Sequence, residues 1–129
     1  MERIVRVWIL LAVMAAFMLT ACGAGEGKSA PENMKFDTTV SNTVFLVETQ
    51  PIDSGYGYSI SVDGKKFISQ TIIPVIEGNH HFQTEEDALN TGKVVVKKML
   101  SSRDLPSLTK EDLMMLGILS QDGSLIIKK

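Results

Sequence analysis

The residues best able to do covalent or metal chemistry are one cysteine and two adjacent histidines. Cys22 is the only cysteine of the 129-residue chain, and His80 and His81 are its only histidines. A cysteine can act as a nucleophile, ligate a metal, form a disulfide or carry an attached group, and each role needs different neighbours. The surroundings of Cys22 therefore decide which chemistry is open to it.

The segment before Cys22 has the pattern of an export signal. Arg3 and Arg6 are followed by an uncharged run over residues 7–19. A membrane-spanning helix needs about 20 apolar residues, so this run is too short to span but has the length of a secretory signal core. The following Leu19-Thr20-Ala21-Cys22 resembles the lipobox of bacterial lipoproteins. The resemblance implies that residues 1–21 are removed as a signal peptide and that Cys22 carries acyl chains.

The other roles of Cys22 find no support in the sequence. A disulfide needs a second cysteine, and a reactive thiol needs a base and a pocket, which the glycine-rich residues 23–27 do not offer. Residues 22–37 are expected to be the lipidated cysteine and a flexible tether. In lipoproteins of the Bacteroidetes, surface export is associated with acidic residues after the cysteine. Here only Glu26 is acidic among residues 23–27, which favours the outer membrane, facing the periplasm.

The overall charge argues against nucleic acid as a partner. The chain has 13 Lys or Arg residues against 15 Asp or Glu residues, a formal net charge of −2. Binding to nucleic acid depends on clustered basic side chains that neutralise phosphates, and the sequence has no basic run. We therefore expect membrane attachment through the lipid alone and no nucleic-acid partner.

The clearest strand pattern begins at residue 56. Apolar residues at every second position predict a strand with one apolar face: Tyr56, Tyr58, Ile60 and Val62. The intervening Ser59 and Ser61 are expected on the solvent face. Asp63-Gly64 favours a type I′ hairpin turn, and residues 67–73 are expected to form the returning strand, ended by Pro74.

Two helices are predicted after this hairpin. Thr84 is a helix N-cap followed by three acidic residues, and the apolar face that follows includes Gly92, whose missing side chain permits close contact with a sheet. Thr109 repeats the capping pattern, and Gly117 can end a helix of two turns.

These elements predict one α+β domain over residues 38–129. We expect a small antiparallel sheet of three to four strands, packed by one long helix, with a second short helix near the C-terminus. Residues 44–47 read as a central strand, and residues 125–127 as a last strand or an apolar tail.

Several short motifs in this order resemble a domain-of-unknown-function family of small secreted or lipid-anchored Bacteroidetes proteins. They include Gly55-Tyr56-Gly57-Tyr58, Asp63-Gly64-Lys65, Ile73-Pro74 and Leu116-Gly117-Ile118. The resemblance covers about residues 44–119. It implies an envelope domain of α+β fold and supplies no activity, ligand, cofactor or catalytic residue.

No arrangement of residues in the sequence predicts catalysis. Adjacent side chains on an extended chain point to opposite sides, so His80 and His81 chelate one metal poorly, and Glu77 could join them only through folding. No serine lies in a Gly-x-Ser-x-Gly motif. We expect no enzyme activity, no metal and no cofactor, and interpret the histidines as part of a polar loop.

Three features suggest binding or modification. Tyr56, Tyr58 and Phe67 form either the core under the long helix or an aromatic surface, and Gln70 pairs either with a neighbouring loop or with a partner's backbone; in each case the first alternative is favoured. Asp37-Thr38-Thr39 resembles a short acceptor for O-glycosylation in Bacteroidetes envelope proteins, which makes Thr38 a candidate site.

The leading hypothesis is a lipid-anchored, non-catalytic binding or accessory module in the periplasm, with an envelope protein as its partner. One alternative is a small enzyme, or enzyme accessory, acting on envelope glycan or peptide through His80, His81 and Glu77. A second alternative is a structural envelope lipoprotein.

Overall fold

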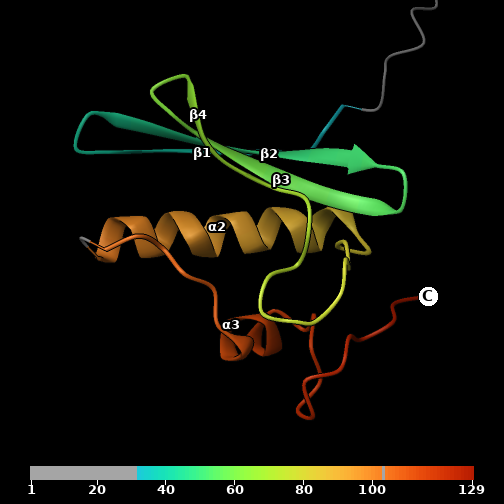
Figure 1. Ribbon diagram of the computed structural model, residues 1–129. Helices are drawn as coiled ribbons and strands as arrows, with labels where there is room; N and C mark the ends of the chain where they lie inside the picture. Colours follow the sequence, from blue (N-terminus) through green and yellow to red (C-terminus); the bar gives the residue numbers. More distant parts are fainter. Residues whose placement is uncertain (1–31, 103) are drawn as a thin grey trace, which may run out of the picture. The chain divides into compact units, whose positions relative to one another are not determined.

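A four-stranded antiparallel sheet forms one layer, and a long helix lies along one of its faces (Figure 1). The computed structural model describes residues 32–102 and 104–129. The strands lie side by side in chain order: β1 (Lys35–Val40), β2 (Thr43–Ile52), β3 (Gly55–Val62) and β4 (Lys65–Gln70). The helices are α2 (Glu85–Ser101) and α3 (Lys110–Met115). This is the predicted α+β architecture.

Two tight turns set the register of the sheet. Asp63 and Gly64, between β3 and β4, have φ values of 48° and 79°, as a type I′ turn requires. Ser41 and Asn42, between β1 and β2, have φ values of 49° and 65°. The first turn was predicted and the second was not, although asparagine tolerates positive φ better than most residues.

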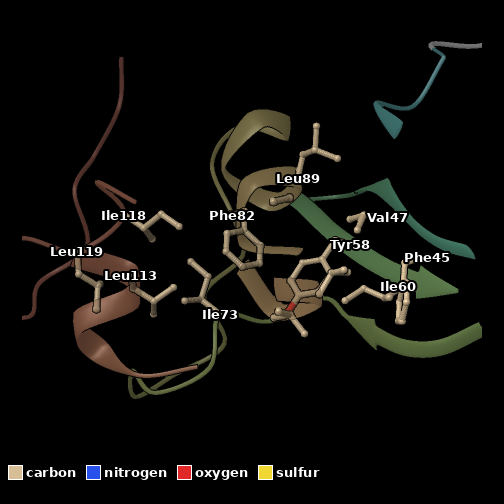
Figure 2. Packing of buried hydrophobic residues seen from close by; sticks show 13 residues of the cluster. Phe45, Val47, Tyr58, Ile60, Ile73, Phe82, Leu89, Leu113, Ile118 and Leu119 are labelled. Carbon is tan, nitrogen blue, oxygen red and sulfur yellow. The ribbon is translucent and has the colours of Figure 1, made fainter. Parts of the chain in front are cut away.

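The core lies between α2 and the two inner strands. Phe45 and Val47 of β2 and Tyr58 and Ile60 of β3 are buried under α2 (Figure 2). A Cβ atom added to Gly92 would come within 2.4 Å of Val47 Cγ1 and 3.2 Å of Tyr58 Cδ2. The close helix–sheet contact expected at Gly92 is therefore confirmed.

A second part of the core connects α3 to the core between α2 and the sheet. Leu113, Ile118 and Leu119 gather beside Ile73, and Phe82 lies between this group and Tyr58 (Figure 2). The last residues of the chain are fixed near the start of α2, where Lys128 Nζ lies 2.5 Å from Asp87 Oδ1. The segment that carries α3 is thus packed against the sheet and helix through buried side chains.

Both helices begin with the expected caps. The Thr84 hydroxyl accepts a hydrogen bond of 3.1 Å from the Asp87 N–H. At α3 the Thr109 hydroxyl accepts from the Asp112 N–H, and the Asp112 carboxylate accepts from the Thr109 N–H, which completes a capping box.

Three details differ from the sequence-based expectations. β1 begins at Lys35, so residues 35–37 lie in the sheet and not in the tether. β4 ends at Gln70 instead of continuing to Ile73. Ser59 and Ser61 are buried, because β3 is an inner strand and small side chains are covered by those of the strands on both sides. Of the two alternatives for residues 125–127, the structure has the tail, with one bridge from Leu119 to Leu125.

Candidate binding site at the edge of the sheet

A cavity of about 260 Å³ opens beside β4, on the face of the sheet that α2 covers. Its floor is Tyr58 of β3, and Val95 of α2 lies at its back. Ile68 and Gln70 of β4 form one wall, and residues 106–108 of the α2–α3 connection form the opposite wall. Its size is near the lower end of ligand pockets, which occupy roughly 300–1,000 Å³, and exceeds the roughly 150 Å³ that holds benzene in an engineered cavity.

The hydroxyl of Tyr58 is the notable polar group of this cavity. Tyr58 is only 2% exposed, and its ring packs against Phe82 with the ring centroids 5.9 Å apart. No described residue forms a hydrogen bond with its hydroxyl, whereas every fully enclosed polar side-chain atom in the described residues has a partner. The hydroxyl must therefore keep some open surface, and the cavity is the space that Tyr58 lines.

Burial also fixes the protonation of this hydroxyl. Desolvation raises the pKa of Tyr58 well above its ordinary value of 10, because the phenolate would lose its hydration. The group therefore remains a neutral O–H, able to donate one hydrogen bond and to accept others, throughout the physiological range.

Gln70 forms part of the cavity rim. Its Nε2 donates a hydrogen bond of 2.6 Å to the carbonyl oxygen of Ile72. This confirms the expectation that Gln70 pairs with a neighbouring loop. In the same loop Val75 has a φ of 76°, a strained value for a β-branched residue, next to Pro74 in the cavity wall.

The opposite wall is held in place by Lys98 of α2. Lys98 Nζ donates a hydrogen bond of 2.9 Å to the Ser107 carbonyl oxygen and lies 2.5 Å from Asp112 Oδ2. Although partial burial of Asp112 acts in the opposite sense, hydrogen bonds from Lys98 and Thr109 hold the pKa of its carboxyl below the ordinary value. Lys98 is therefore engaged within the protein, and the cavity itself is lined by uncharged residues.

Exposed apolar side chains flank the cavity. Phe67 of β4 is 57% exposed and Leu105 of the α2–α3 connection is 84% exposed. Both line a shallower hollow of about 200 Å³, and Pro106 belongs to this hollow and to the cavity. The two hollows adjoin at Pro106 and form a groove with both apolar and polar lining, which includes Ser102 and Asp104.

The predicted aromatic group is divided by the structure. Tyr58 is a core residue and Tyr56 is partly buried against the core, as favoured, whereas Phe67 lies on the surface. The reason is a β-bulge: Ile68 pairs with Ile60 and Lys66 with Ser61, which leaves Phe67 as the extra residue.

The other candidate residues lie elsewhere. His81 Nδ1 donates to the Thr71 carbonyl at 2.5 Å, and no group of three or more His, Cys, Asp or Glu residues in the described ranges is arranged to hold a metal. Thr38 lies in β1, partly buried and paired with Phe45. Cys22 lies outside the described residues. The cavity residues Val95 and 106–108 were not anticipated, because no local pattern marks them.

The family of the chain can now be stated. Residues 48–115 match the family described as Domain of unknown function (DUF4907), and the chain belongs to it. The match confirms the predicted resemblance to a family of unknown function, and it includes every residue of the cavity. No curated protein and no solved structure matches the chain. Within residues 32–102 and 104–129, no helix has the length and apolar character to cross a membrane.

Proposed function

We propose that the chain is a lipid-anchored, non-catalytic binding module of the bacterial envelope, which takes its ligand in the cavity beside Tyr58. Acyl chains on Cys22 hold it at the outer membrane, facing the periplasm. The support for the anchor is the order of basic residues, apolar run and Leu19-Thr20-Ala21-Cys22 in the sequence. The support for binding is the cavity.

One observation carries the binding role: the hydroxyl of an almost fully buried tyrosine has no partner among the described residues and opens into a cavity lined by uncharged residues. A ligand group that enters the cavity can bond to this hydroxyl, and such a hydrogen bond contributes about 0.5–1.5 kcal/mol. Apolar walls with few polar groups that fix orientation are the usual chemistry of a ligand site.

The walls also limit the ligand. Because the lining residues are uncharged and Lys98 is engaged with Asp112, the cavity favours a neutral group over an ion. The fitting group is apolar, about the size of an aromatic ring, with an oxygen placed to accept from the Tyr58 hydroxyl.

Small neutral amides test this site. Benzamide and N-butylacetamide, added separately to the isotope-labelled mature chain, should cause saturable NMR shifts at Ile68, Val95 and Leu108. Tyr58→Phe should weaken the binding of both amides by about tenfold, which is the effect of losing one hydrogen bond in a dry site. The variant should unfold at about the same temperature as the parent, because the hydroxyl forms no hydrogen bond with a described residue.

The matched control is Tyr56→Phe, on the same face of β3 but outside the cavity lining. It should leave both affinities unchanged. Saturable shifts elsewhere in the domain, or none at millimolar amide, would show that the cavity is not a ligand site.

A separate experiment tests the anchor. The full chain, expressed with its own N-terminus in a bacterial host, should be recovered in the membrane fraction with an intact mass that includes acyl chains on Cys22. Cys22→Ser should be recovered without acyl mass and outside the membrane fraction, because each buried methylene contributes about 0.8 kcal/mol to attachment. An unmodified Cys22 in the parent protein would contradict the anchor.

A further inference from the structure

β4 is an edge strand with a free outer side. It pairs with β3 alone, and no backbone hydrogen bond joins it to another segment in the described part of the chain. A free strand edge offers a row of backbone donors and acceptors to any extended chain that lies alongside.

The usual protections of an edge are confined to the start of β4. Lys65, Lys66 and the bulge at Phe67 lie there, and charges and bulges are the devices that discourage strand pairing. From Phe67 to Gln70 the strand carries no charge, and its exposed aromatic side chain is the opposite of a protective one.

The cavity lies where a paired strand would place its side chains. Ile68 and Gln70 are two residues apart on β4, and both line the cavity. Side chains of neighbouring strands in register lie on the same face. A chain added along β4 would therefore direct every second side chain toward the cavity between β4 and residues 106–108.

The charges nearby indicate the composition of that chain. Lys65 and Lys66 are exposed, and neither takes part in an ion pair in the part of the protein that the structure describes. The cavity itself accepts a neutral apolar group. A complementary segment therefore combines an apolar anchor with acidic residues toward the Lys65 end.

We propose that the β4 edge binds an extended peptide segment of an envelope protein, which pairs as a fifth strand, inserts an apolar side chain into the Tyr58 cavity and places acidic residues near Lys65 and Lys66. This rests on the proposed function, because it names the ligand class of the same cavity. The backbone hydrogen bonds supply affinity and the cavity supplies selectivity, as in other cases of strand addition.

A displayed library of short random peptides, selected against the full mature chain, tests the proposal. Enriched peptides should share an apolar residue with acidic residues on one side of it. Each is then synthesised with its normal backbone and with alternate amides N-methylated, which removes strand hydrogen bonds but keeps the side chains. N-methylation should weaken binding by at least about tenfold.

Matched protein variants locate the contact. Gln70→Lys and Thr38→Lys place the same charge on helix-facing positions of the two edge strands. Only Gln70→Lys should weaken peptide binding, by about tenfold, because it buries a charge at the cavity rim. The double variant Lys65→Glu, Lys66→Glu should weaken them several-fold at low salt and less at high salt. Circular dichroism verifies that each variant is folded.

The outcomes separate the two proposals. Peptides that bind equally well when N-methylated, or a selection that enriches none, would overturn strand addition. The cavity as a ligand site would still stand if benzamide shifts Ile68 and Val95 and Tyr58→Phe weakens it. Loss of both results would overturn both proposals.

Discussion

The two edges of the sheet differ in how their aromatic side chains are covered. On β1, Lys35 pairs with Glu48 across the strands at 3.1 Å, and Lys93 of α2 lies over the Phe36 ring, 4.9 Å from its centroid. On β4, Phe67 is exposed and the last four residues carry no charge. Both strands have a free outer side, but only β4 has an exposed aromatic side chain and a cavity beside it.

The family match includes one edge strand of the sheet and not the other. The matched residues 48–115 contain β4 and all residues of the cavity, whereas β1 lies before them. An open apolar edge is a liability for aggregation unless it is used. The family match therefore covers the edge strand that carries the exposed Phe67 and borders the cavity.

The largest expected effect on stability comes from a substitution in α2 that should loosen both edges of the sheet. Gly92→Val should lower the free energy of unfolding by about 3 kcal/mol, since its side chain overlaps Val47 and Tyr58 and α2 must move away from the sheet. Amide exchange should then rise in β1 and β4 alike. Lys97→Val, on the exposed side of the same helix, is the control and should change stability by less than about 0.5 kcal/mol. Exchange that rises at only one edge would show that the edges are anchored separately.

The next effect is confined to the β1 side. Glu85 Oε1 accepts from the Met34 N–H at 2.6 Å and from the Thr49 hydroxyl at 2.5 Å. Glu85→Ala should cost about 2 kcal/mol, because both donors bond to a charged acceptor. Glu86→Ala removes a carboxylate from the same helical turn without these bonds and should cost far less. Equal losses in urea denaturation would assign the effect to the helix dipole.

Acid should destabilise the β1 side of the sheet in the same way as Glu85→Ala. The Met34 and Thr49 hydrogen bonds hold the pKa of Glu85 below its ordinary value of 4.5. The stabilisation is therefore complete above that value and is lost as the pH falls through the lower pKa of the folded state. Amide exchange at Met34 should accelerate in this acid range before exchange in β4 does. Simultaneous acceleration at both edges would contradict a local effect.

A smaller effect is expected from the aromatic contact of β1. Lys93→Met keeps most of the side-chain length but removes the charge over Phe36, and should cost about 0.5–1 kcal/mol. Lys97→Met is the matched control on the same helix and should be neutral. A neutral Lys93→Met would mean that the contact contributes only coverage of the ring.

The smallest effect on stability is expected at β4. Phe67→Lys should change the free energy of unfolding by less than about 0.5 kcal/mol, because the ring lies mostly in solvent. Self-association at high concentration, measured by light scattering, should decrease as the edge gains a charge. A loss above about 1 kcal/mol would show that Phe67 belongs to the core, and the contrast between the edges would then be weaker.

Features that depend on neighbouring residues were predictable. The Asp63-Gly64 turn and the caps at Thr84 and Thr109 follow from side chains that satisfy nearby backbone groups or tolerate positive φ. β1 was not predicted as a strand, because its first residues resemble the polar tether in composition. Ile73 was assigned to a strand by its apolar character, but it packs beside α3.

By itself, the sequence determined the local elements, the α+β class and the pattern at Cys22, since each depends on residue types only a few positions apart. The tertiary structure alone decided which apolar residues became core, which edge strand lies beside a cavity and which residues line that cavity. The cavity residues Tyr58, Val95 and Leu108 are far apart in the chain. They meet only because Gly92 lets α2 pack closely on β2 and β3 and because Lys98 holds the following connection against the groove.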